Sequence, residues 1–100
     1  MTTKFLLLPA IADKAGLLQA FATHCNFAAG FGQNWDALWD SLNDWLEQQA
    51  MPFCLVIDGC QVQQLDQHAW QQCRQILDDA CDSWPGFSYR PEHMPSTGLI

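Results

Sequence analysis

A short stretch, NWDALWDSLNDWLE at residues 34 to 47, carries four acidic side chains and no Lys or Arg. On a helix that turns about 100° per residue, Asp36, Asp40, Asp44 and Glu47 fall within an arc of roughly 80°. Carboxylates in this arrangement can act as acid and base, hold a divalent metal ion or bind a cationic partner. These four residues are termed the acidic stripe below.

The simplest interpretation of the acidic stripe is the solvated face of an amphipathic helix. Two features weaken this interpretation. Asp36, Asp40 and Asp44 form two like-charge pairs at i,i+4 spacing, each of which costs about 0.2–0.5 kcal/mol. Asp44 and Glu47 also lie toward the C-terminal end of the helix, where the helix dipole disfavours negative charge. The stripe therefore costs folding stability, about 1 kcal/mol in sum.

Three tryptophans, Trp35, Trp39 and Trp45, lie in the same stretch as the acidic stripe. Trp35, Trp45 and Trp70 fall on apolar faces, so we expect them to pack in the core, whereas Trp39 lies at the edge of the stripe beside Asn43. An aromatic side chain bordered by carboxylates is typical of a protein–protein interface rather than of a core layer.

An enzyme using two of these carboxylates is a second interpretation. A hydrolase normally gathers its acids from different elements around a concave pocket, and one helix does not supply such a set. Ser41, His24 and His68 lie in no nucleophile motif, and the sequence has no phosphate-binding loop, dinucleotide fingerprint or EF-hand spacing. Asp58 and Gly59, after an apolar run, are typical of a turn. We therefore expect no enzymatic activity, no small-molecule substrate and no cofactor.

The composition limits the partners. Four basic residues against eleven acidic ones give a formal charge of −7, so nucleic acids and acidic membrane surfaces are repelled and a cationic partner is attracted. Residues 15 to 73 contain six acids and no Lys or Arg. One hundred residues at 49% hydrophobic composition are enough for one domain with one core.

The cysteines and the N-terminus indicate the compartment. The five cysteines are odd in number and form no CxxC pair, which predicts reduced packing residues. A zinc site needs close pairs of Cys and His ligands, and His68 and Cys73, one of the closest His–Cys pairs in the sequence, are five residues apart. We therefore expect no metal site. The apolar run before Pro9 is too short for a signal peptide or a membrane span, which favours the cytosol.

Helices and short apolar strands alternate along the chain. The pattern predicts strands at 4–8, 53–58 and, more weakly, 87–90, and helices at 13–25, 34–49 and 66–83, with Asp13, Asn34 and Asp66 as N-caps. The segment 26–33, with two glycines, is expected to be a loop. Helical crossovers between strands favour parallel pairing, so the order predicts an α/β domain with a parallel sheet.

The segment GFGQNWDALWDSLNDWLE at 30 to 47 resembles the defining segment of the barstar-like family, intracellular inhibitors of the bacterial ribonuclease barnase. The shared residues are Gly32, Asn34, Asp36 to Asp40, Leu42, Trp45 and Glu47. Outside this segment the resemblance rests on element order and length. It implies an α/β fold with a three-stranded parallel sheet and about four helices, a single domain at 1–90 and a C-terminal tail at 91–100.

The resemblance also implies a function. The loop and helix at 26–47 would block the active site of a basic secreted ribonuclease, one to one, with Asp40 in the pocket for the scissile phosphate. The implied partner-binding residues are Gly30, Phe31, Asn34, Trp35, Asp36, Trp39, Asp40, Asn43, Asp44, Trp45, Glu47 and, by a looser alignment, Asp79.

The sequence departs from the family pattern at three of these positions. An aromatic residue of barstar aligns with Gly30, a leucine with Trp35 and a glycine with Asp44. Unmatched contacts decide specificity as much as matched ones do. An acidic binding module of the same fold, for another basic protein, is therefore the alternative function.

Overall fold

The computed structural model describes residues 2–27 and 34–95. These residues form five strands and three helices. In order, the elements are β1 (Thr2–Leu7), β2 (Ile11–Ala12), α1 (Lys14–His24), α2 (Trp35–Glu47), β3 (Phe53–Asp58), β4 (Gln64–Leu65), α3 (Gln67–Ser83) and β5 (Phe87–Glu92). The predicted α/β class is confirmed.

The main sheet has three parallel strands in the order β1-β3-β5. The central strand, β3, is buried from Phe53 to Ile57, which explains why its sequence is a continuous apolar run rather than an alternating one. Strands β1 and β5 flank it and have exposed positions. The connection from β1 to β3 contains α1 and α2, and the connection from β3 to β5 contains α3, as parallel pairing requires.

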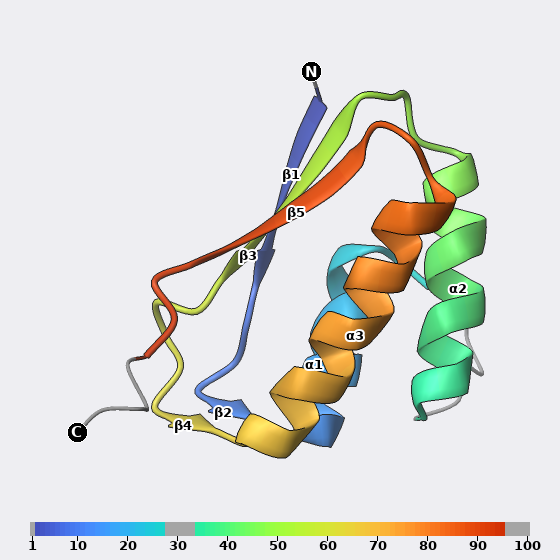
Figure 1. Cartoon of the computed structure of the whole chain (residues 1–100). Coiled ribbons are helices and arrows are strands. Elements are labelled where there is room, and N and C mark those ends of the chain that lie inside the picture. The colour runs from blue at the N-terminus through green and yellow to red at the C-terminus, as the bar shows by residue number, and fades with distance from the viewer. Residues whose placement is uncertain (1, 28–33, 96–100) are drawn as a thin grey trace.

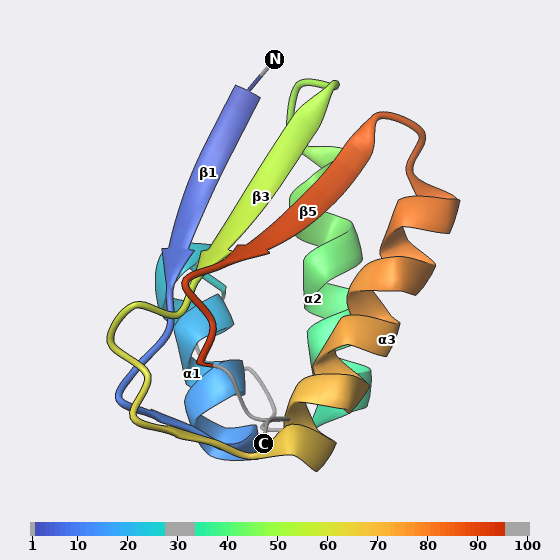
Figure 2. The ribbon, with the colours of Figure 1, turned by 60° about the vertical axis from the view of Figure 1, so that its left-hand side comes forward.

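All three helices of the described residues pack on one face of the sheet (Figure 1). Turning the molecule shows β1, β3 and β5 side by side, with α2 behind β5 and α3 next to α2 (Figure 2). The resemblance implied about four helices, and the described residues contain three. The core lies in the single layer between this sheet and these helices.

The predicted N-caps are confirmed at all three helices. The side chains of Asp13, Asn34 and Asp66 accept hydrogen bonds from backbone N–H groups three residues later, at 2.8, 2.7 and 3.1 Å. Each bond satisfies one of the donors that the first helical turn leaves unpaired. Local chemistry alone therefore sets where each helix begins.

Three features of the strands differ from the prediction. Strand β1 runs from Thr2 to Leu7 rather than over 4–8. Strand β5 continues through Pro91 to Glu92, and a proline is tolerated there because β5 is an edge strand of the main sheet. Short strands β2 and β4 also pair in parallel, Ile11 with Gln64 and Ala12 with Leu65. Two-residue strands carry no periodic signal, so sequence analysis does not detect them.

The turn expected after β3 is confirmed. The Asp58 carboxylate accepts a hydrogen bond from the backbone N–H of Cys60 at 2.9 Å. In the described part of the chain, no helix is long and apolar enough to cross a membrane. Within residues 2–27 and 34–95, no three side chains of metal-binding type come together.

Candidate functional site

Helix α2 presents the acidic stripe because its opposite face is needed for the core. Leu38, Leu42 and Leu46, spaced by four, are completely buried against the sheet layer. This fixes the rotation of the helix, so the residues on the far side must face solvent. Asn34 caps its first turn and Asp36 lies favourably in that turn, while no basic residue occupies the last turn.

All four residues of the acidic stripe are exposed. Among the described residues the only ion pair joins Arg90 to Glu92 on β5, at 2.8 Å, and therefore leaves the stripe uncompensated. Exposed like charges without a counter-ion among the described residues produce a local negative potential. The arrangement is suited to attracting a cationic surface rather than to proton transfer in an enclosed site.

The packing of α1 beside α2 brings the ammonium of Lys14 to the start of α2. The sequence alone did not predict this contact. The ammonium of Lys14, on α1, lies 5.9 Å from the centroid of the Trp35 ring. This is a cation–π contact between residues twenty-one positions apart, and only the packing of α1 beside α2 creates it. Trp35 is thereby held at the edge of the candidate site.

The burial of the tryptophans differs in part from the sequence prediction. Trp70 is buried at 7% exposure, as predicted for the core. Trp35, Trp39 and Trp45 are each half-buried and pack against the core from its margin. The prediction that Trp35 and Trp45 lie inside the core is therefore only partly right, because both keep surface beside the acidic stripe.

The side-chain amide of Asn43 forms two hydrogen bonds within the protein. Its Oδ1 accepts from the indole Nε1–H of Trp84 and its Nδ2 donates to the Trp39 carbonyl, both at 2.7 Å. Asn34 similarly commits its Oδ1 to the helix cap. These two amides therefore position α2, a role that the sequence predicted only for Asn34.

Asp79 lies on α3 rather than on the acidic helix. It is exposed, and its carboxylate accepts a hydrogen bond from Gln75 Nε2 at 3.1 Å. The preceding Asp78 accepts from the Tyr89 hydroxyl of β5 at 2.6 Å, so a turn of about 100° per residue directs Asp79 away from β5. The predicted positions Gly30 and Phe31 lie outside the described residues.

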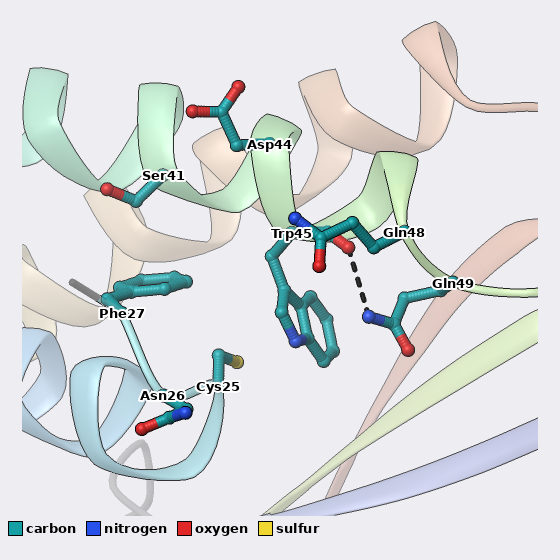
Figure 3. A pocket seen from close by; sticks show the side chains of 8 residues that line it. All are labelled: Cys25, Asn26, Phe27, Ser41, Asp44, Trp45, Gln48 and Gln49. Atoms are coloured by element: carbon teal, nitrogen blue, oxygen red, sulfur yellow. Dashed lines mark hydrogen bonds between the residues drawn. The ribbon is translucent and has the colours of Figure 1, made fainter.

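A pocket of about 490 Å³ adjoins the acidic stripe on the side of α1. Helix α2 contributes Ser41, Asp44 and Trp45 to its wall, and the end of α1 contributes Cys25 with Phe27 just beyond it (Figure 3). Sequence analysis singled out Asp44 and Trp45 but had no signal that joins them to residues some twenty positions earlier.

Burial disfavours the thiolate form of two core cysteines, Cys25 and Cys73. Burial raises the pKa of the Cys25 thiol from 9.0 to about 12, against a smaller lowering by Lys4, and burial alone raises the pKa of Cys73 to about 12. The nucleophilic form of each is therefore scarce at neutral pH. Cys54 is also buried, and all five cysteines are free. The expectation of packing cysteines is confirmed for these three.

Comparison with known proteins identifies a family for this chain. The family model described as "Barstar (barnase inhibitor)" matches residues 1–95, nearly the whole chain. No curated protein matches the chain. The family match covers the parallel sheet, the three helices of the described residues and the acidic stripe alike. The chain belongs to the barstar family.

Proposed function

We propose that this protein is a cytosolic inhibitor, or immunity protein, that binds a basic secreted ribonuclease one to one and blocks its active site. The observation that carries the proposal is the exposed acidic stripe on α2, which has no ion pair among the described residues, in a chain whose family is one of ribonuclease inhibitors. A ribonuclease active site is cationic because it binds RNA. A protein surface with negative charge can therefore occupy it.

Asp40 is the proposed centre of this interaction. It is exposed in the middle of the acidic stripe, one helical turn from Asp36 and from Asp44. In the complex its carboxylate takes the place of the scissile phosphate and meets the cationic catalytic groups of the nuclease. Half-buried Trp39, next to it in sequence, supplies apolar contact area at the border of the charged surface.

No enzymatic activity is proposed. The carboxylates of the acidic stripe come from one exposed helix and face outward, whereas acid–base catalysis needs groups that converge on a reacting atom. The family is one of inhibitors.

The alternative proposal keeps the surface and changes the partner. Gly30, Trp35 and Asp44 depart from the family pattern, and Asp44 adds a carboxylate at the wall of the pocket beside α1. Such a surface also suits a basic protein that is not a ribonuclease. This alternative shares the acidic stripe with the first proposal, so only an assay of nuclease activity separates the two.

The experiment is a titration of RNA cleavage. The purified protein is added to barnase and to the basic ribonucleases secreted by the producing cell. We expect at least one of these enzymes to lose activity in proportion to added protein, with an end point at one equivalent. Asp40→Asn should weaken the inhibition and Asp82→Asn, which removes the same charge from an exposed site on α3, should not. If every nuclease retains full activity, the inhibitor proposal is wrong.

A further inference from the structure

The pocket between α1 and α2 has a lining that favours a cation. Asp44 lines it with an exposed carboxylate, which points away from the rings of Phe27 and Trp45 on the other side of the helix (Figure 3). A carboxylate and aromatic faces both attract positive charge, the first by its full charge and the second through the ring quadrupole. The pocket volume of about 490 Å³ accommodates a long side chain together with water.

The end of α2 adds a third attraction. Gln48 caps the helix and lines the pocket together with Gln49, so the pocket adjoins the negative end of the helix dipole. Gln49 Nε2 donates to the Trp45 carbonyl at 3.0 Å (Figure 3). This bond uses an amide hydrogen, and the amide oxygen remains an acceptor for an incoming donor.

The lining itself contains no Lys or Arg. One cation, Lys4, lowers the pKa of the Cys25 thiol against the larger rise caused by burial. Lys4 is exposed on β1 and does not line the pocket. The pocket therefore has carboxylate, amide and aromatic groups but no internal counter-ion within its lining.

We infer that this pocket receives one arginine side chain of the partner nuclease, as a second contact beside the acidic stripe. The inference rests on the proposed inhibitor function. A guanidinium fits better than an ammonium because it is planar, stacks on aromatic rings and carries five donors for carboxylate and amide oxygens. Trp45 is held for this role by an edge-on contact with Phe53, whose ring centroid is 5.3 Å away at an interplanar angle of 77°.

The first test needs no nuclease. Ethylguanidinium chloride is titrated into the labelled protein, and the indole N–H signal of Trp45, assigned with Trp45→Phe, is followed by NMR. Sodium chloride and ethylammonium chloride at equal ionic strength are the comparisons. We expect a saturable shift with ethylguanidinium, a smaller one with ethylammonium and none with sodium chloride.

Charge variants show whether the shift belongs to this pocket. Asp44→Asn should weaken ethylguanidinium binding at least about threefold, whereas Asp82→Asn, which changes the net charge equally, should leave it unchanged. Equal shifts with sodium chloride, or equal binding by Asp44→Asn and the unchanged protein, would overturn the inference.

The second test uses the nuclease that the protein inhibits. Ser41 is half-buried at the pocket wall, and Ser41→Met fills the pocket with a residue of good helix propensity. We expect inhibition to weaken about tenfold or more with no loss of thermal stability. If Asp40→Asn abolishes inhibition while Ser41→Met and Asp44→Asn do not weaken it, the pocket inference is wrong and the inhibitor proposal stands. If no nuclease is inhibited, the inhibitor proposal fails and the arginine assignment fails with it, whatever ethylguanidinium does.

Discussion

The indole of Trp84, at the C-terminal end of α3, donates a hydrogen bond of 2.7 Å to the amide oxygen of Asn43 on α2. The two residues are 41 positions apart, and the same amide also donates to the Trp39 carbonyl. Asn43 thus ties α2 to the end of α3 through one hydrogen bond, while its second bond, to Trp39, stays within α2 and orients the amide. We expect this link to hold the acidic stripe at a fixed angle to the sheet.

Removing the Asn43 amide should destabilise the protein. Asn43→Ala leaves the half-buried Trp84 indole without its acceptor, which costs about 1–3 kcal/mol in free energy of unfolding. Urea unfolding of Asn43→Ala, Trp84→Phe and the double variant measures the coupling, expected at about 0.5–1.5 kcal/mol. Gln71→Ala, at an exposed position of α3, is the control. Additive effects of the two substitutions would show that the bond contributes nothing to stability.

Asp40→Ala should have opposite effects on binding and folding. Binding to the inhibited nuclease should weaken by about 2–5 kcal/mol, the usual range when one partner of a buried charge pair is truncated. The free protein should be unchanged or stabilised by up to about 1 kcal/mol, because two like-charge pairs disappear and alanine is the better helix former. Calorimetric titration and urea unfolding measure the two quantities. An affinity change below about threefold would exclude Asp40 as the phosphate mimic.

Association with the partner should depend on salt. The acidic stripe is exposed and without an ion pair in the described residues, so it attracts a cationic surface over about one Debye length, ~10 Å at 0.1 M salt. Stopped-flow association rates should fall as sodium chloride rises, with smaller changes in the dissociation rate. Rates independent of salt would contradict steering by the stripe.

Gly16→Ala should destabilise the protein although alanine normally favours a helix. A Cβ at Gly16 would collide with the backbone carbonyl oxygen of Ile11, where α1 meets β2. Backbone atoms cannot move aside as a flexible side chain does, so we expect a loss of about 1–3 kcal/mol in free energy of unfolding. Ala15→Gly, at the exposed neighbouring position, should cost no more than about 1 kcal/mol. Stabilisation by Gly16→Ala in thermal unfolding would disprove this close contact.

Stability should decrease at alkaline pH through the buried thiols. The pKa of Cys73 rises from 9.0 to about 12 on burial, so the folded protein keeps the proton longer than the unfolded chain does. This contribution is complete below pH 9.0 and is lost as the pH rises through about 12. Between these values Cys73→Ala should flatten the fall in unfolding free energy by up to about 1.4 kcal/mol per pH unit. Urea unfolding from pH 7 to 11 measures the slopes, and identical slopes above pH 9 would contradict the assignment.

The sequence by itself determined the helices and the acidic stripe. The N-caps Asp13, Asn34 and Asp66 act within three residues, and the spacing of Leu38 and Leu42 selects the buried face of α2. Such signals depend on neighbours along the chain, so they can be read without knowing the fold.

Only the tertiary structure decided the contacts between elements. The Lys14–Trp35 and Asn43–Trp84 contacts and the pocket beside Trp45 each join residues from different helices or from a helix and the loop before it. Their existence depends on the angle and depth at which the helices pack on the sheet. No local pattern encodes that geometry, because it results from the whole core being filled at once.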